Sequence, residues 1–580
     1  MHVRRACPPA RRSVGPWRRS SVVLIASLAT AAAGGQLAIS PAQAGAAGIA
    51  STGSAMLTGT KAAKVVGEQV NEIAIPTVSG PALRTGSGAR VAASLTAART
   101  ASFRLVAVTW DHGSAARGTR IEVRTGRSGR WTAWQHLDAV PSEGPAARED
   151  SSVRDGTEPL WVDQADGVDV RVIVPAAAKA PAGLEVAAID PGVSSTDQAI
   201  ATDPQSLAAG EVPARSPAAR AAGHGAKITP MPRIISREEW GADPSLGDAC
   251  WAPKFGRSIK MVFIHHTAGS NTYRESDSAA IVRSIYAYHT SARGWCDIGY
   301  NFLVDKYGNV FEGRRGGERR PVRGAHSGDY NVNTAGISLM GNFEDAAPTA
   351  AMKNSLVRLV AWRLATSYVP AEGTTGVAGK RFNRISGHRD AMQTACPGQV
   401  VYDWLPRLRA RVAAKMGNYD TPIYKEWQSE GGLGGMLRAP FIGERWVTGG
   451  RLTVFDRGRI YWSKRFGAHE LHGALLDKYR RLGGIRSRLG YPRSDVVATR
   501  KPGGAVAAFD SGRIISSGRG SHQIYGLILV RYHKEHGIRG KLGFPVADPH
   551  SVRGGLAQRF QNGTITWDTS AGTTTVEYTS

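Results

Sequence analysis

The sequence predicts a central α/β domain in which helices flank a mixed sheet. A small all-β module precedes this domain, and an array of short β-rich repeats follows it. Three observations predict this architecture: strand-like and helix-like apolar patterns interleave over residues 231–413, short strands recur over residues 101–192, and residues 423–570 repeat internally. The length of 580 residues, several times that of one ordinary domain, agrees with such a division.

Apolar periodicity supports the α/β prediction. Residues 259–264, 300–304 and 336–340 read as strands, and other segments carry apolar residues at the three- and four-residue spacing of half-buried helices. Strands and helices in alternation predict a mixed sheet with helices on its faces. The helical stripes are Ile281, Ile285 and Tyr288; Leu356, Val360 and Leu364; and Val401, Trp404, Leu405, Leu408 and Val412.

The all-β module is predicted from residues 103–108, 120–124 and 168–172, which alternate or run apolar between Gly- and Asp-rich turns. We expect a β-sandwich-like fold over residues 101–192. Composition predicts a disordered leader over residues 45–100 and a flexible linker over residues 193–230. Large aromatic side chains in a small β module are mostly core, which we favour over sugar stacking for Trp110, Trp131, Trp134 and Trp161.

The repeats are recognised by their spacing. Arg438-Ala439-Pro440, Gly490-Tyr491-Pro492 and Gly543-Phe544-Pro545 recur at intervals of 52 and then 53 residues. A period near 50 residues with glycine and aromatic punctuation indicates small units that bury a face against one another. A wall-binding array and a structural stalk both fit this pattern.

The N-terminus predicts export. Six arginines precede the apolar run 22–33, and Ala42-Gln43-Ala44 offers a small-x-small cleavage site, so residues 1–44 read as a signal peptide. Arg18-Arg19 also fits a twin-arginine signal, so the route is Sec or twin-arginine. The alternative, a membrane anchor, needs a longer apolar run. No later segment is long enough to span a bilayer, so we expect a secreted or cell-wall protein without an integral span.

Charge suggests polyanionic partners. Lys and Arg number 73 against 47 Asp and Glu, which gives a net charge of +26. A basic protein meets nucleic acid, a membrane surface or anionic envelope polymers. The export signal and the lack of a helix-turn-helix or other nucleic-acid motif favour the envelope, so no nucleic-acid partner is expected.

Cysteine usage agrees with export. There are four cysteines, of which Cys7 leaves with the signal. Cys250 and Cys296 are the natural disulfide pair of an exported chain. Cys396 is then left alone, and a lone thiol outside the cell is a liability unless something, such as a metal, uses it.

Two histidine motifs suggest that a metal uses the Cys396 thiol. His265-His266 closes the strand 259–264, and His388 stands eight residues before Cys396. Imidazoles and a thiolate suit tetrahedral Zn²⁺, and three protein ligands leave the fourth position for water, which is typical of a catalytic site. Taken singly, the histidine pair and the Gly-His-Arg-Asp turn read as ordinary structural residues.

Several separated motifs carry a family resemblance over about residues 232–410. This part of the chain resembles the peptidoglycan recognition protein/type 2 N-acetylmuramoyl-L-alanine amidase family. The resemblance implies an α/β amidase domain with its zinc site in a groove. The motifs are Arg237-Glu238-Glu239-Trp240-Gly241-Ala242, Phe263-Ile264-His265-His266-Thr267, Trp295-Cys296-Asp297-Ile298-Gly299-Tyr300-Asn301-Phe302, Phe311-Glu312-Gly313-Arg314, Gly324-Ala325-His326, Gly387-His388-Arg389-Asp390 and Cys396-Pro397-Gly398.

The resemblance also implies residue roles. It makes His265, His388 and Cys396 the zinc ligands, with Tyr300 and Thr394 as catalytic residues at the reacting carbonyl. Non-catalytic members typically lose the cysteine or the tyrosine, and this chain keeps both. Where the family often has Gly-Trp, Arg314 is followed by Arg315-Gly316-Gly317, so the preferred stem-peptide diamino acid stays open. The candidate substrate-binding residues are Arg314, His326, His266 and Asn331, with a structural role as the alternative for His266.

These implications converge on a wall enzyme. We expect an exported zinc amidase that hydrolyses the amide between the muramic acid lactyl group and L-Ala of peptidoglycan. Leu489-Gly490-Tyr491-Pro492 and Leu542-Gly543-Phe544-Pro545, with the degraded copy Leu437-Arg438-Ala439-Pro440, resemble the Leu-Gly-Phe-Pro repeats of actinobacterial envelope proteins. Such repeats would hold the enzyme to envelope polymers. The alternative is a non-catalytic protein that binds or tethers peptidoglycan.

Overall fold

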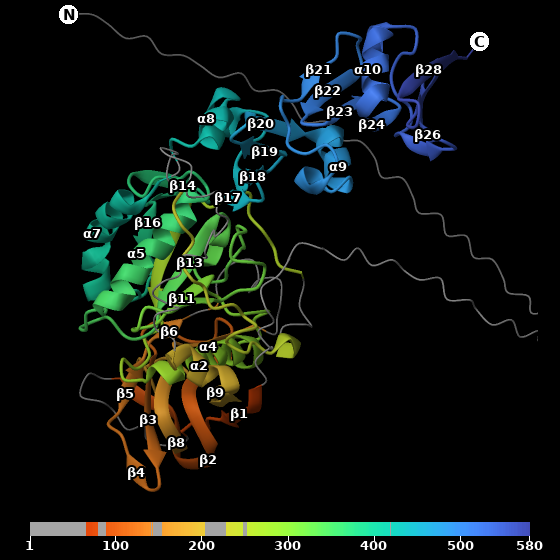
Figure 1. The fold of residues 1–580 in the computed structure, drawn as a ribbon. Coiled ribbons are helices and arrows are strands. Elements are labelled where there is room, and N and C mark those ends of the chain that lie inside the picture. The colour runs from red at the N-terminus through yellow and green to blue at the C-terminus, as the bar shows by residue number, and fades with distance from the viewer. Residues whose placement is uncertain are drawn as a thin grey trace, which may run out of the picture. The chain divides into compact units, whose positions relative to one another are not determined.

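A computed structural model describes residues 65–78, 89–140, 142, 153–202, 228–246, 252–417 and 419–579. Within these ranges the chain forms a nine-stranded β module, a five-stranded α/β domain and three four-stranded repeat sheets (Figure 1). The predicted fold class is confirmed for all three parts. The predicted signal peptide, residues 1–44, lies outside the described residues.

Long strands build the β module. Its sheet has the order β1-β9-β2-β8-β3-β4, and β5, β6 and β7 pair at its sides. Register shifts along β2 and β8 let these strands bend around a core that includes Phe103, Val170 and Val186. The strands are β1 (Val65–Ala74), β2 (Arg90–Asp111), β3 (Arg120–Arg127), β4 (Arg130–Trp131), β5 (Gln135–Leu137), β6 (Ala139–Val140), β7 (Arg154–Thr157), β8 (Leu160–Val174) and β9 (Glu185–Ser194).

The module is larger than the sequence predicted. The expected disordered leader is wrong for β1 and for the first half of β2, because β1 pairs along its length with β9. The expected linker is wrong for its first residues, which complete β9 and form the helix α2 (Ser195–Thr202). Residues 45–64, 79–88 and 203–227 of the two segments lie outside the described residues.

The tryptophans of the module divide into two kinds. Trp110 and Trp161 are buried, as predicted. Trp131 is 36% exposed, and the Arg124 guanidinium lies over both its ring and that of Trp134. Cation–π contact with arginine therefore replaces core packing at the second pair.

The sheet of the α/β domain is mixed, as predicted. Its order is β12-β11-β13-β10-β16, in which only β11 and β12 pair antiparallel. The central position of β10 places its carboxyl end between the ends of two parallel neighbours. The strands are β10 (Met261–His266), β11 (Phe302–Val304), β12 (Val310–Glu312), β13 (Thr334–Leu339) and β16 (Ile385–Gly387), beside a separate pair β14 (Thr374–Val377) and β15 (Lys380–Asn383).

Helices cover both faces of this sheet. The helices α5 (Ala350–Ala365) and α7 (Gln399–Lys415) lie side by side on one face and share a core with Ile264 and Ile337 (Figure 1). The helix α4 (Ser278–Ala287) belongs to a second core with Leu303, and the π-helical turn η4 (Tyr288–Ala292) continues it. The predicted helical stripes are confirmed, since their apolar residues face these cores.

Each repeat combines one helix with one antiparallel sheet. The helices α8 (Pro422–Ser429), α9 (Gly473–Arg481) and α10 (Gly526–Lys534) carry Trp427, Tyr479 and Tyr532, the aromatics that share one phase of the repeat. The four strands of the successive sheets are β17 (Pro440–Val447), β18 (Gly450–Phe455), β19 (Gly458–Ser463) and β20 (Gly467–His472); β21 (Val497–Ala498), β22 (Gly504–Phe509), β23 (Gly512–Ser517) and β24 (Gly520–Ile524); and β25 (His550–Val552), β26 (Gly555–Phe560), β27 (Gly563–Asp568) and β28 (Thr573–Tyr578).

The aromatic residues at the shared repeat position make the same contacts in each repeat. Tyr479 stacks on Phe509 and donates to the carbonyl of Gly490 at 2.6 Å, and Tyr532 stacks on Phe560 and donates to that of Gly543. Trp427 repeats the arrangement with Phe455 and Arg438. The spacing of these residues in the sequence therefore reflects a repeated unit of packing. None of the helices within the described ranges combines the length and apolar character needed to cross a membrane.

Candidate active site

Strand register brings the first two predicted ligands together. Ile264 of β10 pairs with Gly387 of β16, so His265 and His388 follow at the carboxyl ends of adjacent parallel strands. After His388 the chain turns through the short helix α6 (His388–Ala391) and returns to Cys396, whose carbonyl accepts from the Arg389 N–H at 2.9 Å. The carboxyl edge of a parallel sheet is where α/β folds place ligand sites.

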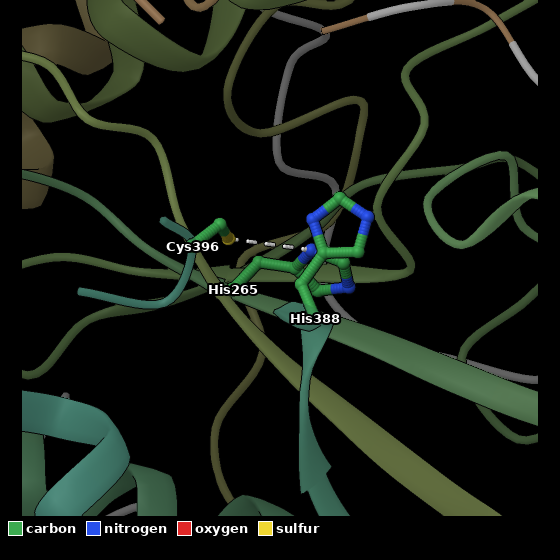
Figure 2. Close-up of side chains that lie close together, drawn as sticks. All are labelled: His265, His388 and Cys396. Carbon is green, nitrogen blue, oxygen red and sulfur yellow. Dashed lines mark hydrogen bonds between the residues drawn. The ribbon is translucent and has the colours of Figure 1, made fainter. Parts of the chain in front are cut away.

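The three side chains form one compact, buried cluster (Figure 2). Their donor atoms all lie within 4.8 Å of one another, and the Cys396 Sγ and His265 Nδ1 are 3.7 Å apart. His265, His388 and Cys396 are 1%, 4% and 2% exposed. Three buried donors at this separation can surround a single metal ion.

The electrostatics of the cluster suit a cation. Burial lowers the pKa of His388 to about 3 and that of His265 well below its ordinary value, so both imidazoles are neutral and keep a free lone pair. The Nδ1 of His388 has no hydrogen-bond partner within the described part of the chain. Burial raises the pKa of the Cys396 thiol, which only a nearby positive charge would reverse. The backbone N–H of His266 donates to the Cys396 Sγ at 3.3 Å and orients it.

Three further predicted residues reach the pocket beside the cluster. The ring of Tyr300 lies 5.3 Å from that of His265, centroid to centroid, and burial raises its pKa, so the phenol stays protonated. The Nδ1 of His326 is 3.1 Å from the Nε2 of His265. Arg314 also lines the pocket and donates to the Ile298 carbonyl at 3.2 Å.

The other predicted site residues accept hydrogen bonds from the backbone near the cluster. Thr394 accepts the backbone N–H of Cys396 at 3.2 Å, which positions a ligand. Asn331 accepts the backbone N–H of His326 at 2.8 Å, and His266 accepts that of Phe343 at 3.4 Å. None of the three is among the described residues that line the pocket. Their hydrogen bonds support the site from outside.

One wall of the pocket comes from the β module, which the sequence did not predict. Beside His265, Tyr300 and His388, the lining includes Val140, Ser142, Val153, Thr157, Glu158 and Pro159. Residues so distant in sequence carry no local signal of this contact. His289 and Trp295, stacked ring on ring, line the pocket from the α/β domain and were also missed.

Buried Arg293 fixes that wall. Its guanidinium donates to the carbonyls of Arg154 at 3.0 Å and Val140 at 2.8 Å, and to the Ser142 hydroxyl at 2.7 Å. The Trp295 indole also donates to Ser142, and the Tyr288 hydroxyl donates to the Thr157 carbonyl. The hydrogen bonds join the two parts around the pocket.

The cysteine predictions have different outcomes. Among the described cysteines Cys396 carries the free thiol, as predicted. Cys250 lies outside the described residues, so its disulfide with Cys296 stays a prediction.

Known families match all three parts of the chain. The family model described as N-acetylmuramoyl-L-alanine amidase matches residues 255–399. The model described as "Rv3811 N-terminal galactose-binding domain-like" matches residues 64–196, and the LGFP repeat matches residues 439–487, 489–540 and 542–579. The first match covers the cluster of His265, His388 and Cys396, and the second includes β1, in agreement with the structure.

Individual relatives agree with the first match. Peptidoglycan recognition protein 1 of Bos taurus is 34% identical over 170 residues, which are 29% of this chain and 80% of the relative. The Mus musculus protein of the same name is 31% identical over 176 residues, 30% of this chain and 87% of the relative. The solved structure of Drosophila PGRP-LB shares 29% identity over 30% of this chain and 91% of that one, with a TM-score of 0.25. The chain therefore belongs to the peptidoglycan recognition protein and N-acetylmuramoyl-L-alanine amidase family.

Proposed function

We propose that the chain is an exported, zinc-dependent N-acetylmuramoyl-L-alanine amidase. It hydrolyses the amide between the lactyl group of muramic acid and L-Ala, which frees the stem peptide from the glycan. The observation that carries this proposal is the buried cluster of His265, His388 and Cys396, with donor atoms within 4.8 Å of one another. Relatives named for peptidoglycan recognition support the substrate class.

The donor set fits zinc. Two neutral imidazoles and one thiol match the nitrogen and sulfur ligands that Zn²⁺ prefers, and the unpartnered Nδ1 of His388 gives one of them a free lone pair. Three protein ligands leave a position for water or substrate. When bound, zinc would polarise the lactyl carbonyl and lower the pKa of water.

The residues around the cluster would stabilise the reacting carbonyl, bind the stem peptide and position Cys396. The protonated hydroxyl of Tyr300 would donate a hydrogen bond to the carbonyl oxygen as negative charge develops on it. Arg314 offers its guanidinium to a carboxylate of the stem peptide. Thr394 would act on Cys396 through its backbone N–H, as a positioning residue.

The segments on either side of the amidase domain would bring the enzyme to the cell wall and keep it there. The N-terminal signal would export it, a Cys250–Cys296 disulfide would brace it outside the cell, and the repeats would hold it to envelope polymers. The support for this placement is the match to the LGFP repeat and the net charge of +20 that remains without the six arginines of the predicted signal, which favours anionic polymers.

Digestion of purified peptidoglycan tests the proposal. The mature chain loaded with Zn²⁺ should release stem peptides that begin with L-Ala, detected by mass spectrometry. A chelated sample and a Cys396→Ser variant should release none. If the protein pellets with the wall but cuts no bond, it is instead a non-catalytic recognition or tethering protein.

A further inference from the structure

The β module is built into the active site. Its residues Leu105, Trp161 and Ile189 share one buried core with Ile281 and Ile285 of α4. At the edge of this core, the buried Arg283 forms a two-pronged ion pair with Asp197 of α2 at 2.7 and 2.8 Å. Shared apolar packing and a buried ion pair hold the module against the α/β domain, and with it the wall that the module gives to the pocket.

Glu158 is the ionisable side chain of that wall. It is 8% exposed and lines the pocket together with His265, His388 and Tyr300. Among the described residues that line this pocket it is the only acidic one. Its backbone N–H donates to the Asp138 carbonyl at 2.8 Å, which anchors the main chain, while its carboxyl group feels the charges of Arg293 and Asp138 without a hydrogen bond to either.

We propose that Glu158 is the catalytic carboxylate of this site and that the β module is therefore part of the enzyme's active centre. This inference rests on the proposed amidase function. The carboxylate accepts a proton from the attacking water as the water oxygen bonds to the lactyl carbonyl carbon. It then returns that proton to the nitrogen of L-Ala as the carbon–nitrogen bond breaks. Water is consumed, and a lactyl carboxylic acid and a free amine result.

The surroundings of Glu158 suit proton transfer. Burial raises its pKa to about 8, while the Arg293 charge opposes that rise and the Asp138 charge adds to it. Tyr288 and Tyr300 are the titratable neighbours that feel its charge from the α/β domain, and Cys396 feels it as well. A general base works best when its pKa lies near the operating pH, because it must both take up and release the proton.

The variant Glu158→Gln tests the proposal in the full mature chain. Because Gln has the same shape and no charge to bury, the variant should keep the wild-type melting temperature and bound zinc per chain. On a soluble muropeptide, kcat should fall about 100-fold or more with KM unchanged. Wild-type kcat should also fall as the pH is lowered and Glu158 becomes protonated, whereas the residual rate of the variant should lack that fall.

Two controls separate catalysis from structure. Asp163→Asn removes a carboxylate from the same module at a side chain that is 82% exposed, and it should leave every readout unchanged. Glu158→Ala should regain activity when formate is added, because a small carboxylate can occupy the vacated space. A structural role for Glu158 gives no such rescue.

The outcomes are distinguishable. If the wild-type chain releases no product, the proposed amidase function fails. If it does, and Glu158→Gln keeps its rate within about 2-fold and the same pH dependence, the role of Glu158 is overturned. A lowered melting temperature in Glu158→Gln, together with no formate rescue in Glu158→Ala, also overturns it.

Discussion

In the proposed mechanism, Tyr300 is the hydrogen-bond donor beside the predicted metal site. Its ring packs beside His265, and burial keeps its hydroxyl protonated. Replacing it by Phe removes the donor and leaves the ring, so Tyr300→Phe should lower kcat by about 100- to 1000-fold, the usual effect of losing one such donor. Zinc content should not change. Steady-state kinetics on a muropeptide check this, with Tyr419→Phe, at a 36% exposed ring, as control. An unchanged kcat would remove Tyr300 from the mechanism.

His289 should make stability depend on pH. Burial, aided by the Arg293 charge, lowers its pKa well below 6.5, so below that pH the unfolded chain binds a proton that the folded chain does not. The stabilisation is fully present above pH 6.5 and is lost as the pH falls, by at most about 1.4 kcal/mol per pH unit. In urea unfolding, His289→Asn should therefore flatten this slope below pH 6.5. The exposed His550→Asn should not, and equal slopes in both variants would contradict the account.

The cluster of predicted ligands could be anticipated from the sequence, whereas several residues around it could not. His265, His388 and Cys396 follow strands or short turns, where residue type and spacing alone suggest a metal. Glu158 carries no such signal, because only the folded chain brings it to them. For the same reason the sequence did not show that Asn331, which stays a predicted substrate-binding residue, accepts the backbone N–H of His326.

At the scale of elements, pairing between distant strands limits what a sequence reveals. The strands β10, β11 and β13 and the apolar faces of α4, α5 and α7 have strong apolar periods and were predicted, whereas the short strands β12 and β16 were not. In contrast, β1 lies in a small-residue, polar segment, and its pairing with β9, over 100 residues away, was not visible. The same holds for α2, whose Asp197 pairs with Arg283 of α4, 86 residues away in the sequence.

The ion pair between Arg283 and Asp197 should stabilise the contact between the β module and the α/β domain. Asp197→Ala would leave the buried Arg283 charge without its partner, so the free energy of unfolding should fall by about 3–5 kcal/mol. The double variant Arg283→Met with Asp197→Ala should recover much of this loss. Denaturant unfolding measures both, with the exposed Asp163→Ala as control. A loss below about 1 kcal/mol in Asp197→Ala would mean that the pair does not stabilise the join.

At the scale of the whole molecule, charge should govern attachment to the wall. A net charge of +20 after loss of the six arginines of the predicted signal, together with an LGFP repeat array, predicts binding to anionic envelope polymers. Because salt screens such attraction, the fraction of protein that pellets with purified walls should fall as ionic strength rises from about 0.05 to 0.5 M. Cleavage of a small soluble muropeptide should change far less. If the bound fraction does not change with salt, binding to the wall does not depend on charge.

The identity of the broken bond tests the central claim most directly. A defined muropeptide is incubated with the zinc-loaded chain in ¹⁸O-labelled water, and the products are weighed by mass spectrometry. Amidase action predicts one ¹⁸O atom in the lactyl carboxylate of the glycan product and none in a stem peptide that begins with a free L-Ala amine. Label in the peptide, label at a sugar carbon, or an intact substrate would contradict the account.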